Sequence, residues 1–223
     1  MMMNTPIYGG PESDVPDGIP EIIGVASAGV HARHETFLDK KIDFQENIDS
    51  FSSTTIELKS TLDEGKKALL DLKTSDKVSD GLEIASAKWV DSKEKTKTVI
   101  SELNKISSEA EKLFSSAEEH VKTIQDDKLK NEASGRIAKN KEFFTKRFQT
   151  LQEKLASFSK LHAKIDDTLK YLEIVQQKKD IQEKITDIVT QIDTESESFT
   201  NETKTFSETS KGIFDKAPED ISK

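Results

Sequence analysis

The sequence predicts an all-α protein: an elongated antiparallel bundle of three to four long helices with coiled-coil heptad packing. Three observations lead to this prediction. Apolar residues recur at alternating steps of three and four, as from Phe144 through Leu151 to Leu172. Proline is absent between Glu21 and Ala217, and an interior proline would cost a helix about 3 kcal/mol. Only 33% of the residues are hydrophobic and 34% are charged, which suits narrow apolar seams between helices.

Four apolar stripes can be followed along the chain. A stripe that repeats every 3.5 residues stays on one side of a helix only where a partner helix bends with it. The stripes contain Phe37, Phe44, Ile48, Phe51, Leu58, Leu62, Leu69 and Leu72; then Leu82, Trp89, Val99, Leu103, Ile106 and Leu113; then Phe144, Phe148, Leu151, Leu155, Phe158, His162, Ile165, Leu169 and Leu172; and finally Ile181, Ile185, Ile188, Ile192, Phe199, Phe206 and Ile213. We therefore expect each stripe to lie against another helix.

The stripes change phase at three places, and each change predicts a turn. The first lies between Leu72 and Val78, where Ser and Asp side chains are suitable N-caps. The second lies between Ile124 and Ile137, and the third, near 177–180, depends on the phase alone. Segments of roughly 35 to 48 residues would be about 50 to 70 Å long. Short connections favour antiparallel neighbours, but periodicity equally allows the stripes to pair between chains, as in a dimeric or trimeric coiled coil.

The chain divides into a flexible leader rich in Pro and Gly at 1–30, a long-helix bundle at 31–216 and a disordered tail at 217–223. The leader ends in a short apolar stretch that is too short to span a membrane. We interpret this stretch as a cap over one end of the bundle, with a docking or membrane-touching segment as the alternative. The apolar residues of this predicted interaction segment are Ile22, Ile23, Val25 and Val30.

Composition limits the classes of partner and compartment. Lys+Arg 33 against Asp+Glu 42 gives a net charge of -9, so binding to nucleic acid or to an anionic membrane is unfavourable. The absence of cysteine excludes disulfides, thiolate ligands and cysteine nucleophiles. The N-terminus has no pattern of a cleavable signal peptide. The cytoplasm is therefore the favoured compartment, and secretion without a cleavable signal is the alternative.

No motif in the sequence predicts catalysis, a cofactor or a metal site. His31 and His34 have a spacing that two metal ligands can use, but no third ligand accompanies them. A di-iron bundle requires Glu three residues before a ligand histidine, and neither His120 nor His162 has one. Glycine-rich phosphate-binding loops are also absent. We therefore expect no enzyme activity, no cofactor, no metal and no small-molecule substrate.

Polar residues interrupt the stripes at several positions. Such interruptions weaken the apolar packing, and they either fix the register of the helices or leave the bundle able to rearrange. The interrupting residues are Lys41, Thr55, Ser92, Thr96, His120, Glu195 and Glu202.

These features favour a non-enzymatic structural or interaction protein, a rigid coiled-coil bundle that acts as a scaffold or docking module. Its expected partner is another protein or a second copy of the chain. The alternative is a membrane-active helical protein, such as a soluble component of an α-helical pore-forming toxin or a secreted effector. That hypothesis is motivated by the long amphipathic helices, the interrupted stripes and the small apolar stretch. The net negative charge and the lack of a long hydrophobic hairpin speak against it.

Overall fold

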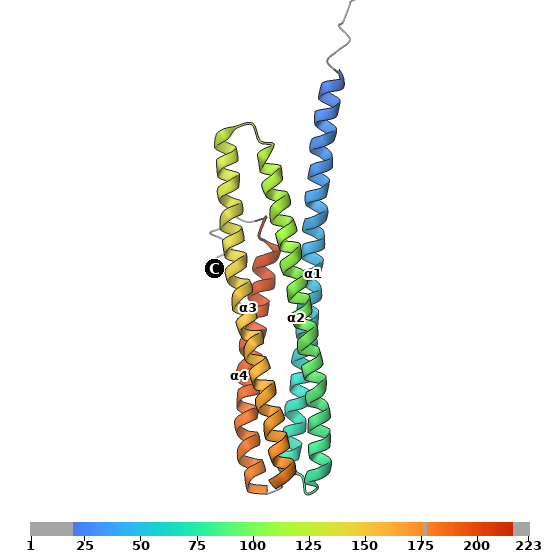
Figure 1. The fold of residues 1–223 in the computed structure, drawn as a ribbon, viewed down its shortest axis with the longest axis vertical. Helices are drawn as coiled ribbons and strands as arrows, with labels where there is room; N and C mark the ends of the chain where they lie inside the picture. Colours follow the sequence, from blue (N-terminus) through green and yellow to red (C-terminus); the bar gives the residue numbers. More distant parts are fainter. Residues whose placement is uncertain (1–19, 176–177, 216–223) are drawn as a thin grey trace, which may run out of the picture.

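A computed structural model of the 223-residue chain describes residues 20–175 and 178–215, with side chains described from Phe37 onward except at Lys178. These residues form an elongated antiparallel bundle with no strand among them, as predicted (Figure 1). The helices are α1 (Pro20–Thr74), α2 (Val78–Lys122), α3 (Asp127–Val175) and α4 (Lys178–Lys211).

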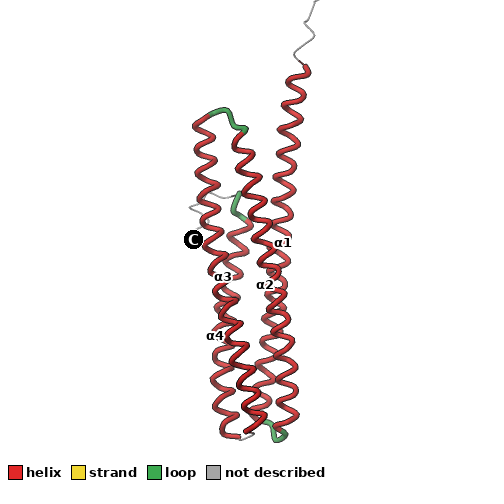
Figure 2. The backbone as a smooth tube through the Cα atoms, in the orientation of Figure 1, coloured by secondary structure: helices red, strands yellow, loops and turns green. Residues whose placement is uncertain are grey.

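The four helices form a ring in which each runs opposite to its neighbours. α1 packs against α2 and α4, and α3 packs against the same two helices from the other side. Each helix therefore covers the apolar stripes of two others, and the bundle closes within one chain (Figure 2).

The turns lie where the stripes change phase. After α1, the backbone N–H of Lys77 donates to Ser75 Oγ at 3.1 Å. Before α3, Asp126 Oδ1 accepts a hydrogen bond from the backbone N–H of Leu129 at 2.9 Å, which is an N-cap contact. α3 ends at Val175 and α4 begins at Lys178, so the third change of helix is close to its predicted place.

The predicted stripes form the core. Most of their residues are almost fully buried, and Phe37 and Phe148 are partly buried against them. One phenylalanine from each helix meets in an aromatic layer, where the ring of Phe144 lies 5.7 to 6.0 Å from those of Phe44, Phe114 and Phe206. Ring pairs at this spacing stabilise a core beyond the area they bury.

The two ends of the bundle differ. At one end the α1–α2 turn lies beside the end of α3 and the start of α4 (Figure 1). At the other end α4 stops below the α2–α3 turn, and α1 extends beyond that turn (Figures 1 and 2). We call this second end the open end, because α1, α2 and α3 continue there without α4.

α1 begins at Pro20, so it includes part of the 1–30 stretch that the sequence assigns to the leader. The side chains of the predicted interaction segment in that stretch, and the tail 217–223, lie outside the described residues.

Candidate functional site

A groove of about 470 Å³ lies at the open end, above the end of α4. Its lining residues are Ile124, Leu129, Glu132, Ala133, Arg136, Ile137, Asn140 and Phe214. Those on α3 recur at helical spacing and therefore share one face of that helix. Phe214 bounds the groove below, with its ring centroid 5.4 Å from the rings of both Phe37 and Phe114.

The groove exists because the apolar face of α3 continues after its partner helix ends. Near Phe144 this face packs against Phe206 of α4. Closer to the start of α3, the same face presents Ile137, Ala133 and Leu129 to the groove. Leu129 is 56% exposed, so the open end carries apolar surface that the chain's described part leaves uncovered.

Asn140 is the polar group at the lower limit of the groove. Its side chain is buried, and Nδ2 donates a hydrogen bond to the carbonyl oxygen of Ile213, which ties the residues after α4 to α3. Its Oδ1 is also buried but has no hydrogen-bond partner among the described residues. A buried acceptor without a partner costs about 1–3 kcal/mol, so a donor in the groove that reached this oxygen after a small shift of the Asn140 side chain would be stabilised.

Asn140 was not predicted from the sequence, because a strict heptad repeat from Phe144 gives Lys141 as the next buried position. In the structure Asn140 is buried and Lys141 is exposed. A helix with 3.6 residues per turn drifts by about 20° per heptad from a 3.5-residue repeat. Extending the third stripe towards the start of α3 with the helical period would have pointed to residue 140.

A second unusual region lies in the middle of the bundle, around Trp89. The indole ring is 1% exposed and lies against Gly65 of α1. A Cβ atom at Gly65 would lie 3.1 Å from Trp89 Cε3, a contact tighter than side chains normally make. Gly65 lies between Leu62 and Leu69 of the first stripe, and it thus provides space for the largest side chain of the second stripe.

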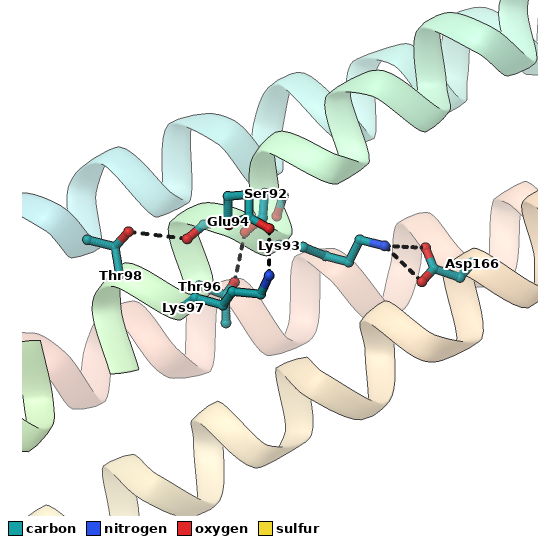
Figure 3. Close-up of polar contacts among 7 residues, drawn as sticks. All are labelled: Ser92, Lys93, Glu94, Thr96, Lys97, Thr98 and Asp166. Carbon is teal, nitrogen blue, oxygen red and sulfur yellow. Dashed lines mark hydrogen bonds and ion pairs between the residues drawn. The ribbon is translucent and has the colours of Figure 1, made fainter. Parts of the chain in front are cut away.

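Three buried polar atoms near Trp89 have no hydrogen-bond partner within the described part of the chain: Trp89 Nε1, Ser92 Oγ and His162 Nε2. The rings of Trp89 and His162 meet edge to face, with centroids 5.1 Å apart. Ser92 lies one turn beyond Trp89, and its carbonyl oxygen accepts a hydrogen bond from Thr96 Oγ1 at 2.9 Å (Figure 3). The middle of the bundle is therefore tightly packed but polar.

Burial, together with the positive charge of Lys93, lowers the pKa of His162 from 6.5 to about 4, and Asp166 partly opposes this shift. The imidazole is therefore neutral at pH 7. Lys93 Nζ contacts both carboxylate oxygens of Asp166 at 2.9 Å, an ion pair that joins α2 to α3 beside this region (Figure 3).

The predicted interruptions of the stripes fall into two groups. Thr55, Ser92 and Thr96 are buried in the core. The longer side chains lie at its edges, because their apolar stems can pack while their polar ends reach solvent. Lys41 pairs there with Asp215, Glu202 lies 3.3 Å from Arg147, and both His120 and Glu195 are partly buried.

The structure brings Ser92 and Thr96 together and spreads the other interruptions along the bundle. Among the residues with described positions, no three His, Asp or Glu side chains form a group that could hold a metal ion. Within the same residues, none of the helices has the length and apolar character needed to cross a membrane. No protein family model, curated protein or solved structure matches this chain.

Proposed function

We propose that the protein is a non-enzymatic structural or interaction protein, in which a closed helical bundle acts as a scaffold or docking module for a protein partner. The groove at the open end is the observation that carries this proposal. It combines an apolar lining with a buried acceptor, Asn140 Oδ1, that has no partner among the described residues.

The composition of the groove supports binding. Its centre is apolar, with Ile124, Ala133 and Ile137, and charges of both signs stand at Glu132 and Arg136. An apolar centre with a polar rim is the usual arrangement of a protein interface. The net charge of -9 disfavours a polyanionic partner, so a protein surface or a second copy of the chain is the favoured class.

The rest of the bundle suits a scaffold. Along the length of α4 its core is filled by side chains from all four helices, and close packing of this kind resists deformation. A surface held at one end of such a bundle keeps its shape without a partner, which lowers the cost of ordering on binding.

Site-specific photo-crosslinking tests the proposal. A photoreactive phenylalanine analogue replaces Leu129 in the groove, and in a control protein it replaces Thr98, an exposed residue in the middle of α2. In the cells that express the protein, we expect a discrete adduct with one identified protein from position 129 but not from position 98. No adduct at position 129, or the same adducts from both positions, would contradict a docking role for the groove.

A membrane-active helical protein is the second candidate. The observation that favours it is the set of polar groups inside the bundle, including Thr55, Ser92 and His162, since these weaken the packing that holds the helices together. Co-sedimentation with liposomes tests this function on the full chain and on a chain that lacks residues 1–30. If neither protein sediments with the liposomes, membrane activity is wrong.

A further inference from the structure

We propose that the groove at the open end binds an amphipathic helix of a partner protein, and that this helix takes the place of a fourth helix above the end of α4. This inference rests on the proposed function, because it names the class of partner that the docking surface would accept.

The groove is continuous with the α3–α4 interface. The face of α3 that packs on α4 near Phe144 continues through Asn140, Ile137 and Ala133 to Leu129. α4 covers the first part of this face and ends at Lys211. A surface shaped to accept one helix therefore continues past the helix that the chain provides.

The dimensions fit a short helix. Asn140 donates to the carbonyl oxygen of Ile213, so it marks the height at which α4 ends, and α3 begins at Asp127. The rise between Asp127 and Asn140 is about 20 Å at 1.5 Å per residue. Three to four helical turns would fill this length, and antiparallel alternation around the ring favours a direction opposite to that of α3.

The lining favours a helix over an extended segment. An extended peptide gains affinity by pairing its backbone with an exposed strand edge, whereas the lining residues of the groove come from helix α3, from Ile124 in the α2–α3 turn and from Phe214 after α4. A helix satisfies its own backbone and needs only side-chain contacts. Ala133, with its small side chain, would allow the two helices to approach closely.

The chemistry of the partner helix follows from the same residues. Apolar side chains at i, i+3 or i+4, and i+7 would cover Ile124, Ala133 and Ile137. Because the backbone N–H groups of a helix are already bonded, the donor for Asn140 Oδ1 would be a hydroxyl or amide side chain. Polar and charged residues would flank the apolar stripe beside Glu132 and Arg136.

A peptide copied from α4 tests the inference on the full-length protein. Residues 181–194 carry the apolar stripe Ile181, Ile185, Ile188 and Ile192. A fluorescent peptide of this sequence, stapled on its polar face to hold the helix, is titrated with protein and followed by anisotropy. The control peptide has the same composition, but its isoleucines are moved so that no stripe remains.

We expect saturable binding of the striped peptide and at least tenfold weaker binding of the control. Ala133→Glu should weaken binding of the striped peptide at least tenfold. Leu129→Glu is the second groove variant, because an exposed position tolerates the change even if Ala133→Glu does not fold. Ile174→Glu is the matched control, since Ile174 is 85% exposed near the end of α3 and lies outside the groove; its affinity should equal that of the unchanged protein.

Several results would overturn the inference. These are equal binding of the two peptides, no binding of the striped peptide, or binding that neither groove variant changes. Stronger binding after removal of residues 216–223 would assign the groove to the chain's own C-terminal segment. A dimer that Ala133→Glu dissociates in light scattering would assign it to a second copy. If the peptide fails while position 129 still crosslinks one identified protein, the helix inference falls and the docking function stands.

Discussion

Trp89 in the middle of the bundle and Leu129 at its open end are both large apolar side chains, but the first is 1% exposed and the second 56% exposed. Around Trp89 all four helices are present, and a glycine on α1 makes room for the ring. Around Leu129 α4 has ended, and a groove remains. The comparison indicates that the middle of the bundle is closely packed, whereas at the open end the described residues leave apolar surface uncovered.

Truncation of each side chain to alanine should give the largest difference in stability between the two regions. Trp89→Ala should lower the free energy of unfolding by about 3–5 kcal/mol, because it removes a fully buried ring and leaves a cavity. Leu129→Ala should lower it by less than about 1 kcal/mol, since most of the side chain is already exposed. Urea denaturation followed by circular dichroism measures both, and equal losses would contradict the division between the two regions.

Acid should weaken the middle of the bundle through His162. Its pKa in the folded protein is about 4, below the 6.5 of an exposed histidine. Between these values the unfolded chain binds a proton that the folded chain does not, so stability falls as the pH drops from about 6.5 to 4 and this loss is complete below 4. With allowance for partial solvent screening, we expect a loss of about 2–3 kcal/mol.

His162→Gln is the control for the acid effect, because glutamine is polar but does not titrate. The free energy of unfolding is measured at pH 7 and at pH 4.5 for both proteins. The two proteins contain the same carboxylates, so the difference between the two pH dependences reports the effect of His162. Identical pH dependences would show that the histidine is not desolvated in the folded bundle.

Gly65 and Gly135 extend the comparison to backbone positions. Replacing each with leucine should change the free energy of unfolding in opposite directions. Gly65→Leu places a side chain against the ring of Trp89, whose Cε3 lies 3.1 Å from the position that an added Cβ atom would take, and should cost about 1–3 kcal/mol by overpacking. Gly135 on α3 has no atom within 4 Å of an added Cβ. Gly135→Leu should therefore raise stability by about 0.5–1 kcal/mol through helix propensity. Thermal unfolding of the two variants measures the signs, and a loss of stability in both would contradict this expectation.

Much of the fold could be predicted from the sequence, because the stripes and their phase changes are local properties of the chain. Phe51, Leu103, Leu155 and Ile188 lie in the core as their spacing indicates. The axial position of one helix relative to its neighbour depends on tertiary packing and not on local sequence. No pattern in the sequence therefore predicts that Gly65 lies opposite Trp89.

The groove at the open end could be predicted only in part. The segments expected from the sequence already differ in length, and in the structure α4 has 34 residues and α3 has 49, but the sequence does not show at which end of α3 the extra length lies uncovered. That difference leaves the start of α3 without a fourth helix. Asn140 is not predicted for a related reason. A strict heptad repeat holds only where a partner helix bends with α3, and α4 ends at the height of Asn140.

Two ion pairs that join α2 to α3 allow the two regions to be compared through their surface charges, and here we expect the smallest effects on stability. Lys93 and Asp166 meet in the middle of the bundle with two contacts of 2.9 Å, and their side chains are 31% and 35% exposed. Lys141 and Glu118 meet nearer the open end with one contact of 3.2 Å, at 50% and 49% exposure. Exposed pairs contribute about 0–1 kcal/mol, and the contribution falls as solvent and salt screen the charges.

Double-mutant cycles with alanine measure the coupling within each pair. We expect a coupling of about 0.5–1 kcal/mol for Lys93 and Asp166, and no more than about 0.3 kcal/mol for Lys141 and Glu118, because the first pair has two contacts and less solvent around it. In about 1 M salt the second coupling should vanish, while part of the first remains, since burial limits screening. Equal couplings of the two pairs in low salt, or complete loss of the Lys93–Asp166 coupling in high salt, would contradict this expectation. Either result would mean that solvent screens the charges in the middle of the bundle as strongly as those nearer the open end.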